Sequence, residues 1–231
     1  MIDCILYLKM LSKLHVAIEG AVAVGKSTLL PKLHEVFLAE LPNIKMDLVP
    51  EPVDRWVDWK GTNPEGSSWN LLELMYQHPE ENAARFQMAA AISKIQSLND
   101  SPGPSKLVER TLLCQEKVFI PLLIKNGYLS GLDQSILAQF FQMTRDMTGL
   151  KADVIIYLRT SPEIAMTRIQ SRNRTGEQNI TLDYLTNLHE LYDDWLIYKR
   201  EERNVVVIDV DDFDKVSPEN IFARVMDHLE K

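Results

Sequence analysis

The segment Gly20-Ala21-Val22-Ala23-Val24-Gly25-Lys26-Ser27 constrains the fold of this chain more than any other. It follows an apolar run at residues 14–18 and precedes a helix-like segment at residues 26–40. Glycine, four residues and then Gly-Lys-Ser is a phosphate-binding loop when a strand comes before it and a helix after it. The pattern predicts that the chain binds a nucleoside triphosphate. A glycine-containing turn with a surface lysine is the alternative.

The loop also assigns contacts to individual residues. Backbone N–H groups of such a loop curl around phosphate oxygens at the positive end of a helix. We expect the Lys26 ammonium to reach the β- and γ-phosphates and the Ser27 hydroxyl to bind Mg²⁺. The other residues expected at the phosphates are Gly20, Ala23, Val24, Gly25 and Thr28.

Composition limits the kind of protein this is. The chain has 231 residues, 45% of them hydrophobic, and a formal net charge of -8, which fits one α/β domain at residues 14–231. The acidic balance argues against binding to nucleic acid or to anionic membranes. Cys4 and Cys114 form no CxxC pair, so neither a zinc site nor a disulfide framework is indicated, and we expect a cytoplasmic protein.

Residues 1–13 are predicted to be a short N-terminal extension. Their apolar patch follows Asp3 and precedes Lys9, which reverses the charge order of a secretory signal. Met10 is an alternative start. No apolar run in the chain approaches the length of a membrane span.

Apolar runs alternate with segments of helical period, which predicts a five-stranded parallel sheet covered by helices on both faces. The predicted strands are residues 14–18, 45–49, 106–109, 153–158 and 204–208. The predicted helices are residues 26–40, 70–76, 80–99, 111–125, 130–148, 162–172, 181–202 and 218–230, the last with Ser217 as its N-cap.

Ligands of open α/β sheets bind at the carboxyl ends of the strands. Glu51 follows the second predicted strand and lies between Pro50 and Pro52, which restrict its backbone. Its carboxylate is a candidate base for a substrate hydroxyl. A loop glutamate that pairs with Arg55 or with solvent is the alternative.

Glu109 and Arg110 follow the third predicted strand. Glu109 is a candidate to hold Mg²⁺ or its waters, and Arg110 to steady the transferring phosphate. A salt bridge that caps the next helix is the alternative.

Arg168, Arg172 and Arg174 follow the fourth predicted strand, and Gly176 lets the loop close. The forked guanidinium group of arginine binds phosphate oxygens well, so residues 168–180 are predicted to form a lid that covers the phosphates. A solvated basic face is the alternative. The aspartates at residues 209–214 lack the spacing of an EF-hand, and we expect a turn there, with Phe213 free to pack on a flat ring.

Gln87 lies beside Phe86 in an otherwise apolar helical segment. An amide offers a donor and an acceptor side by side, which matches the edge of a nucleobase.

Five motifs in this order resemble those of the cellular-type deoxyribonucleoside kinases. This family comprises the deoxycytidine, deoxyguanosine and mitochondrial-type thymidine kinases and the multisubstrate deoxynucleoside kinase. The resemblance covers about residues 14–213. The motifs are residues 18–28, residues 50–56, Phe86-Gln87, Glu109-Arg110-Thr111 and the three arginines Arg168, Arg172 and Arg174.

The resemblance implies a P-loop kinase fold with an arginine-rich lid. It also implies a homodimer that transfers the γ-phosphate of ATP, with Mg²⁺, to the 5′-hydroxyl of a 2′-deoxynucleoside in nucleotide salvage. Glu51 would be the base, Lys26 and Arg110 would be catalytic cations, and Ser27 and Glu109 would contact the metal. Tyr76 and Glu177 would hold the sugar 3′-hydroxyl. Gln87 would read the base in a slot of Trp56, Met75, Phe86 and Phe119, and Asp212 and Phe213 would contact adenine.

Two positions depart from the family pattern. Lys94 stands where the deoxycytidine and deoxyguanosine kinases have arginine, and Gln115 stands where they have aspartate. Lysine and glutamine cannot reproduce a bidentate arginine–aspartate pair. Ala90 and Gln115 leave room for a methylated pyrimidine, so we expect a leaning toward pyrimidines with broad tolerance.

Two other functions remain open on the sequence. A nucleoside monophosphate kinase of the thymidylate kinase type shares the loop, the lid and the size. A non-catalytic, kinase-shaped subunit would be expected to lack Lys26, Glu51 or the lid arginines, and this chain has them all.

Overall fold

The computed structural model describes residues 13–60, 66–148, 151–172, 180–199, 202 and 204–230. Its centre is a five-stranded parallel sheet with strand order β2-β5-β1-β6-β7. The strands are β1 (His15–Glu19), β2 (Met46–Val49), β5 (Ser105–Glu109), β6 (Val154–Arg159) and β7 (Val205–Asp209). The predicted α/β fold with a five-stranded parallel sheet is confirmed. Each predicted strand lies within one residue of an observed one.

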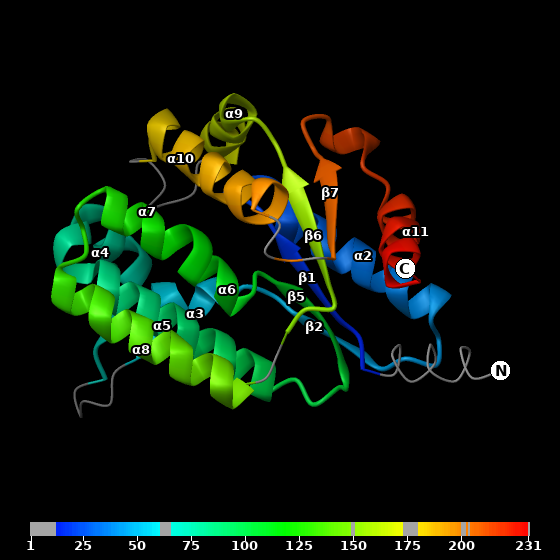
Figure 1. Cartoon of the computed structure of the whole chain (residues 1–231), viewed down its shortest axis with the longest axis horizontal. Helices are drawn as coiled ribbons and strands as arrows, with labels where there is room; N and C mark the ends of the chain where they lie inside the picture. The colour runs from blue at the N-terminus through cyan, green and yellow to red at the C-terminus, as the bar shows by residue number, and fades with distance from the viewer. Residues whose placement is uncertain are drawn as a thin grey trace.

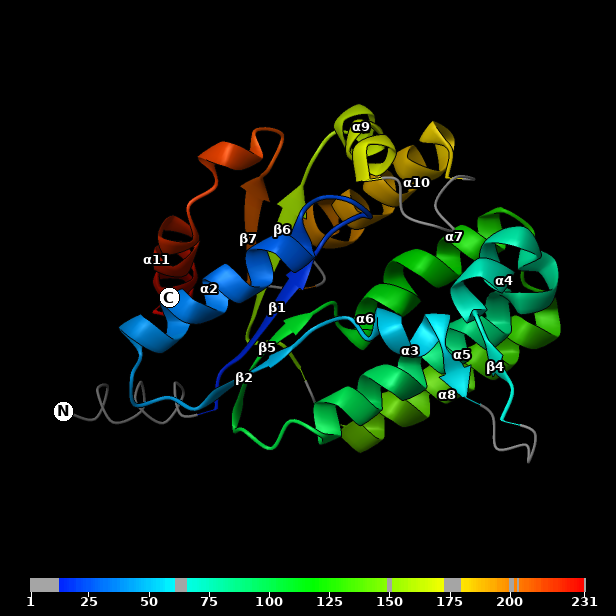
Figure 2. The same ribbon diagram turned by 180° about the vertical axis from the view of Figure 1, so that it is seen from behind.

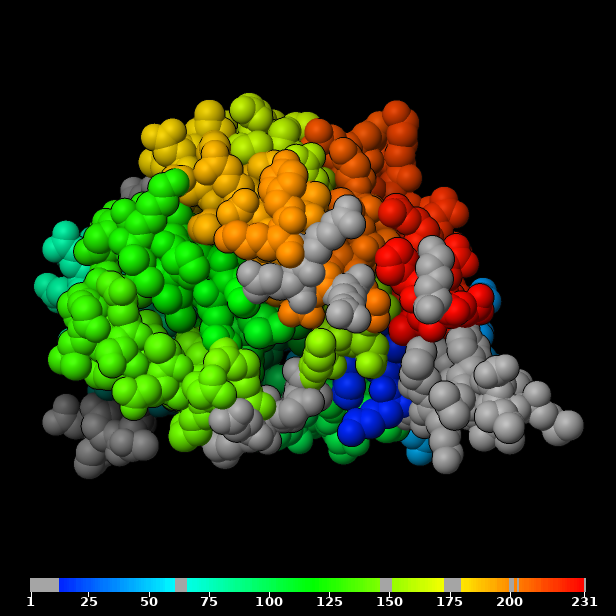
Figure 3. Space-filling model, in the orientation of Figure 1, coloured from blue at the N-terminus to red at the C-terminus, as the bar shows by residue number. Residues whose placement is uncertain are grey.

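Helices cover both faces of the sheet. α2 (Lys26–Glu40) and α11 (Pro218–Leu229) lie on one face, and α10 (Leu182–Asp193) lies on the other (Figures 1 and 2). The helices α4 (Leu71–Gln77), α5 (Pro79–Asn99), α7 (Ile120–Lys125) and α8 (Gly131–Thr148) gather on the side away from α11. In the space-filling view α10 (orange) lies directly against this green helical part (Figure 3).

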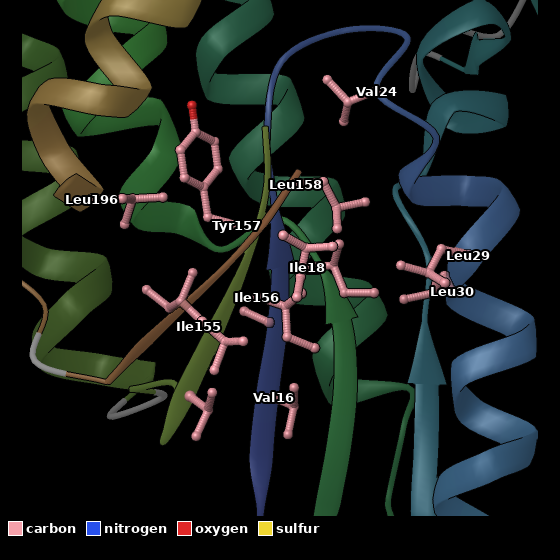
Figure 4. Close-up of a cluster of buried hydrophobic side chains, with 14 of the residues drawn as sticks. Val16, Ile18, Val24, Leu29, Leu30, Ile155, Ile156, Tyr157, Leu158 and Leu196 are labelled. Carbon is pink, nitrogen blue, oxygen red and sulfur yellow. The ribbon is translucent and has the colours of Figure 1, made fainter. Parts of the chain in front are cut away.

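The core lies between β1, β6 and α2. Ile18, Ile156 and Leu158 point toward Leu29 and Leu30 of α2, and all five side chains are buried (Figure 4). Burying each such side chain contributes roughly 1.5–3 kcal/mol. This packing fixes the start of α2, and with it the loop that precedes α2, against the central strand.

Side-chain caps set the beginnings of several helices. Ser217 accepts a hydrogen bond from Asn220 N, Thr181 from Tyr184 N and Asn70 from Glu73 N. Each cap satisfies an N–H group that has no partner inside the helix. The predicted N-cap at Ser217 is confirmed.

Two predicted helices are not continuous. The segment at residues 111–125 is α6 (Leu112–Cys114), a π-helical turn η1 (Gln115–Phe119) and α7. Pro121 cannot donate to the carbonyl of Lys117, and a wider turn before it accommodates the missing bond. The segment at residues 181–202 changes after α10 to a second π-helical turn, η2 (Asp194–Tyr198).

Three short elements were not predicted, because each is too short to show a period. They are α3 (Val53–Val57), β3 (Trp59–Lys60) and β4 (Ser68–Trp69). The turn expected at residues 209–214 includes the start of a 3₁₀ turn, η3 (Phe213–Lys215). The helix α9 (Pro162–Arg172) has its predicted bounds. Among the helices that the structure describes, none combines the length and apolar character needed to cross a bilayer.

Candidate active site

A cavity of about 720 Å³ lies at the carboxyl ends of β1, β2 and β5, between the phosphate-binding loop and the helices α4 and α5. It is lined by all the predicted site residues in the described part of the chain except Gly20, Val24 and Asp212. Arg174 and Glu177 lie outside the described residues, as does most of the predicted lid. Side chains far apart in the sequence therefore meet at one place.

Glycine is required at two positions of the loop. Gly20 has a φ of +144°, and a Cβ there would lie 2.5 Å from the carbonyl oxygen of Leu158. Gly25 has a φ of +98°, and its Cβ would lie 2.3 Å from the ring of Phe213. Both positions exclude a side chain by backbone strain and by contact. The side chain of Val24 is buried in the core and anchors the loop, so a contact of Val24 with the phosphates would be made by its backbone N–H group.

The ammonium of Lys26 lies folded against this loop. Its Nζ donates to the carbonyl oxygens of Gly20 at 3.0 Å and Ala21 at 2.7 Å. Burial and, after it, the nearby Arg110 lower the pKa of Lys26 to about 8, against the carboxylates of Glu109, Glu51 and Glu19, which raise it. The site holds a cation whose charge is costly until an anion joins it.

Glu51 and Arg110 form a close ion pair in the cavity. Nη1 of Arg110 lies 2.5 Å from both carboxylate oxygens of Glu51. Burial alone would raise the pKa of Glu51, but Arg110 and then Lys26 hold it below its ordinary value. Arg55, the alternative partner, instead donates to Gln96 and Asp100.

Arg110 is fixed from several directions. Its backbone is in the left-handed region, with a φ of 60°, which is uncommon for a residue with a side chain. Its guanidinium donates to Gly20 O at 3.3 Å and Tyr192 Oη at 3.4 Å, and lies over the Phe119 ring. These contacts aim the guanidinium at Glu51.

Glu109 pairs with the loop rather than with Arg110. Its Oε1 accepts from Ser27 Oγ at 2.8 Å, and its Oε2 lies 3.5 Å from the backbone N–H of Glu51. The predicted metal contacts, Ser27 and Glu109, are thus neighbours that offer hard oxygen ligands. In the described part of the chain, no three His, Cys, Asp or Glu side chains cluster as a protein-only metal site would require.

A buried carboxylate that the sequence did not single out supports this edge of the sheet. Glu19 accepts two hydrogen bonds at 2.7 Å, from the N–H and from the hydroxyl of Thr111. Tyr192 Oη donates to its other oxygen at 3.4 Å. Burial raises the pKa of Glu19 against these bonds. Glu19 ties the end of β1 to the residue that follows Arg110.

The apolar end of the cavity is a slot between rings. Trp56 and Phe86 meet edge to face, with centroids 5.3 Å apart, and Met75 packs in the same cluster. Trp56 is held by a bond from its Nε1 to Ser93 Oγ at 2.8 Å. Trp56, Phe86 and Gln87 line the same cavity.

Two amides and a lysine border this slot. Nε2 of Gln115 donates to the backbone O and to Oε1 of Gln87, each at 3.1 Å. Lys94 reaches past the slot, and its Nζ donates to Glu109 O at 2.5 Å and Pro50 O at 3.5 Å. Burial lowers the pKa of Lys94 against the attraction of Glu51 and Glu109.

Tyr184 of α10 also lines the cavity and was missed by the sequence. Burial raises the pKa of its hydroxyl, and the nearby Tyr76, with which it forms a hydrogen bond, raises it further. The only sequence signal for Tyr184 was its position in the turn after Thr181, where any residue can stand.

Arg168 and Phe213 close the loop side of the cavity. Nη2 of Arg168 donates to Val210 O at 2.6 Å and Asp211 O at 3.1 Å, and its guanidinium lies 5.8 Å from the Phe213 ring centroid. Within the described residues, its buried Nη1 has no hydrogen-bond partner. Asp212, predicted at adenine, points to solvent and pairs with Lys215.

A protein-family model described as deoxynucleoside kinase matches residues 16–231. Deoxycytidine kinase of Bos taurus is 29% identical over 240 residues, which cover 93% of this chain and 90% of that protein. Deoxycytidine kinase of Rattus norvegicus is 30% identical over 240 residues, which also cover 93% of this chain and 90% of that protein. The mitochondrial thymidine kinase 2 of Macaca fascicularis is 29% identical over 184 residues, which cover 79% of this chain and 64% of that protein.

Proposed function

This chain belongs to the deoxynucleoside kinase family, and from that premise we propose that its substrate is a pyrimidine 2′-deoxynucleoside, with broad tolerance for other bases. It is an ATP-dependent kinase, and the acceptor is the 5′-hydroxyl. The reaction supplies monophosphates for nucleotide salvage. The family match does not favour a nucleoside monophosphate kinase or a non-catalytic subunit.

The catalytic roles proposed for these residues rest on one observation: the Glu51–Arg110 ion pair lines the same cavity as Lys26. Glu51 is ionised at neutral pH because Arg110 and Lys26 hold its pKa low. It accepts the hydrogen bond of the 5′-hydroxyl and takes its proton as the oxygen bonds to the γ-phosphorus and ADP leaves. The carboxylate, fixed by Arg110, orients the attacking oxygen.

The cations around the loop neutralise the moving phosphoryl group. Lys26 and Arg110 contact it from the sheet edge, and Arg168, Arg172 and Arg174 contact it from the lid. The Nη1 of Arg168, which has no hydrogen-bond partner among the residues that the structure describes, supports this role. Phosphoryl transfer of this kind depends mainly on alignment and charge, so no covalent intermediate on the protein is needed.

Ser27 and Glu109 are the residues that would hold Mg²⁺. Their oxygens are neighbours, and hydroxyl and carboxylate oxygens are ligands that Mg²⁺ prefers when it stays bound to phosphates and water. The ion would neutralise charge on the β- and γ-phosphate oxygens.

The other end of the cavity holds the nucleoside. Tyr76, with Glu177, binds the sugar 3′-hydroxyl, and Tyr184 orients the Tyr76 hydroxyl. Gln87 reads the base in the slot of Trp56, Met75, Phe86 and Phe119. The ring of Phe213 contacts the adenine of ATP.

We also propose one kinase domain at residues 14–231, with a lid at about residues 168–180, that assembles as a homodimer through α5 and α8. Ile92 of α5 and Leu132, Ile136 and Met143 of α8 are large apolar side chains exposed on these two packed helices. Such a patch favours burial against a second copy. Sedimentation of Leu132→Glu beside the unmodified chain tests the assembly.

A cytoplasmic location is proposed on composition. Only two cysteines occur in the chain, and Cys114 is free and buried. Cell fractionation tests this proposal.

A substrate panel tests the function. Initial rates are measured with thymidine, deoxycytidine, deoxyadenosine and deoxyguanosine and with their 5′-monophosphates, at the same ATP and Mg²⁺ concentrations. We expect turnover of nucleosides, fastest with pyrimidines. Turnover of monophosphates alone would overturn the proposal.

A further inference from the structure

A network of side-chain hydrogen bonds joins α10 to the end of β6. Asp193, buried on α10, accepts from Arg159 Nε at 3.0 and 3.1 Å and from Arg159 Nη2 at 2.9 Å. The hydroxyl of Tyr157 donates to the same carboxylate at 2.8 Å. In the described part of the chain, none of these three side chains lines the active-site cavity. The network therefore supports the site from behind.

His189, one turn before Asp193 on α10, completes the network. Its Nδ1 lies 3.0 Å from Thr160 O, and a carbonyl oxygen only accepts, so Nδ1 carries the hydrogen and donates it. In the neutral ring Nε2 is then an acceptor, and Arg159 Nη2 donates to it at 3.1 Å. Both ring nitrogens are bonded, which fixes the ring against the backbone where β6 ends.

The segment that His189 binds, residues 159–161, connects β6 to α9 and is also bonded to the turn after β7. Thr160 Oγ1 donates to Asp211 Oδ1 at 2.7 Å, and the backbone N–H of Ser161 donates to the same oxygen at 2.9 Å. These two bonds, that of the hydroxyl first, hold the pKa of Asp211 below its ordinary value. The segment therefore ties α10 to the turn after β7.

This turn in its place holds Arg168 of α9. Nη2 of Arg168 donates to Val210 O and Asp211 O, and its guanidinium lies over the ring of Phe213. Arg168 and Phe213 line the cavity on its loop side. A shift of Thr160 would move the carbonyl groups that hold Arg168.

On the premise of the proposed function, we propose that His189 is a positioning residue for the phosphate donor. Its bond to Thr160 O sets residues 159–161 against α10, and the bonds of this segment to Asp211 set the turn that holds Arg168. The support is α10, which packs directly against α9 (Figures 1 and 2). His189 does not line the cavity, so it acts through the backbone that it binds.

His189→Leu removes both bonds of the ring, and His189→Asn is its matched variant, because the asparagine amide places an NH₂ group near the position of Nδ1. For His189→Leu we expect KM for ATP to rise by about threefold to tenfold, as the loss of one hydrogen bond would cause, while KM for the deoxynucleoside stays within about twofold. His189→Asn should recover most of this rise. A loss of folded protein alone would lower the apparent kcat and leave both KM values unchanged.

His34→Leu is the control. His34 is half-buried on α2, and its Nε2 donates to a backbone carbonyl, that of Met46, at 2.9 Å, but it does not line the cavity. The substitution removes a bond of the same kind at a place that holds no part of the site. Both KM values should equal those of the unmodified protein.

Thr160→Val tests the second link of the network. It removes one hydroxyl, and the exposed Asp211 keeps the N–H of Ser161 and contact with water, so the variant should fold even where His189→Leu does not. KM for ATP should rise by about twofold to fivefold. Thr160→Ser keeps the hydroxyl and should restore the KM of the unmodified protein.

The outcomes separate this inference from the proposed function. An unchanged KM for ATP in folded His189→Leu, or equal rises of both KM values, would overturn the role of His189 and leave the kinase function standing. If His189→Leu does not fold, an unchanged KM for ATP in Thr160→Val would overturn it. Failure of the unmodified protein to phosphorylate any deoxynucleoside would overturn the proposed function, and this inference with it.

Discussion

Arg110 holds both carboxylate oxygens of Glu51 at 2.5 Å, although the two residues are 59 positions apart in the sequence. The contact joins the ends of two strands of one sheet, β2 and β5. It fixes the direction of the carboxylate and keeps it ionised, since the guanidinium offsets the effect of burial on its pKa.

Glu51→Gln should lower kcat by a factor on the order of a hundred or more, because an amide cannot accept the hydroxyl proton. Binding of ATP should persist, since Lys26 and the loop are unchanged. Steady-state rates and ATP calorimetry measure both effects. Glu35→Gln, at an exposed position on α2, is the control. Unchanged turnover would remove Glu51 from the chemistry.

Lys26→Met should abolish turnover of ATP and yet raise the free energy of unfolding at pH 7 by about 1–3 kcal/mol. The pKa of Lys26 is about 8 in the folded chain and near 10.5 when unfolded, so below pH 8 folding buries a costly charge. Between these values the unfolded chain binds more protons, and the stability of the unmodified protein rises with pH. The gain from the substitution should therefore shrink between pH 8 and 10.5. Urea unfolding at pH 7 and pH 9.5 measures it.

A loss of stability at pH 7 in Lys26→Met would contradict this account. It would mean that the bonds from Lys26 to Gly20 O and Ala21 O outweigh the burial of the charge.

The strands and the loop were predictable because their signals are local. A short apolar run bounded by turn residues is a strand whatever it packs on, and Gly25 needs its positive φ wherever the loop occurs. Glu51 could be found because two prolines and a strand end mark it. These local signals were enough to predict the sheet and the polar end of the site.

The rest depends on contacts between distant segments. Tyr184 looks like any residue of an amphipathic helix, and only the fold brings it to Tyr76. The π-helical turn η1 changes the phase of its helix, so the contact of Gln115 with Gln87 does not follow from spacing. Lys94 resembles a base-reading cation by position, yet its ammonium lies on the strand ends.

Tyr184→Phe should raise KM for the deoxynucleoside by about threefold to tenfold and leave KM for ATP unchanged. The loss of the hydrogen bond between Tyr184 and Tyr76 frees the Tyr76 hydroxyl to turn away from the sugar. Rates with 2′-deoxy and 2′,3′-dideoxy nucleosides measure this, because the discrimination between them should also fall. Tyr198→Phe, at an exposed position, is the control. Unaltered discrimination would show that Tyr184 only packs.

Lys94→Met should lower kcat by about tenfold for deoxycytidine and deoxyuridine alike. The Lys94 ammonium joins Glu109 O at the end of β5 to Pro50 O at the end of β2, so it positions the two segments that carry Arg110 and Glu51. It also helps to hold the pKa of Glu51 down. Without the Lys94 ammonium the pKa of Glu51 should rise. The fall of kcat on the acid side of its pH profile should then move to higher pH, which a merely structural loss would not cause.

The ratio of kcat/KM for deoxycytidine to kcat/KM for deoxyuridine separates this role from base reading. Lys94→Met should leave the ratio unchanged, and Lys94→Arg should recover part of kcat because it keeps a donor and a charge. If Lys94→Met alters the ratio and leaves the pH profile in place, the ammonium reads the base, as its position in the family pattern implies. In that case the role implied by the position of Lys94 in the sequence would be correct, and its contacts with Glu109 O and Pro50 O would not exclude base reading.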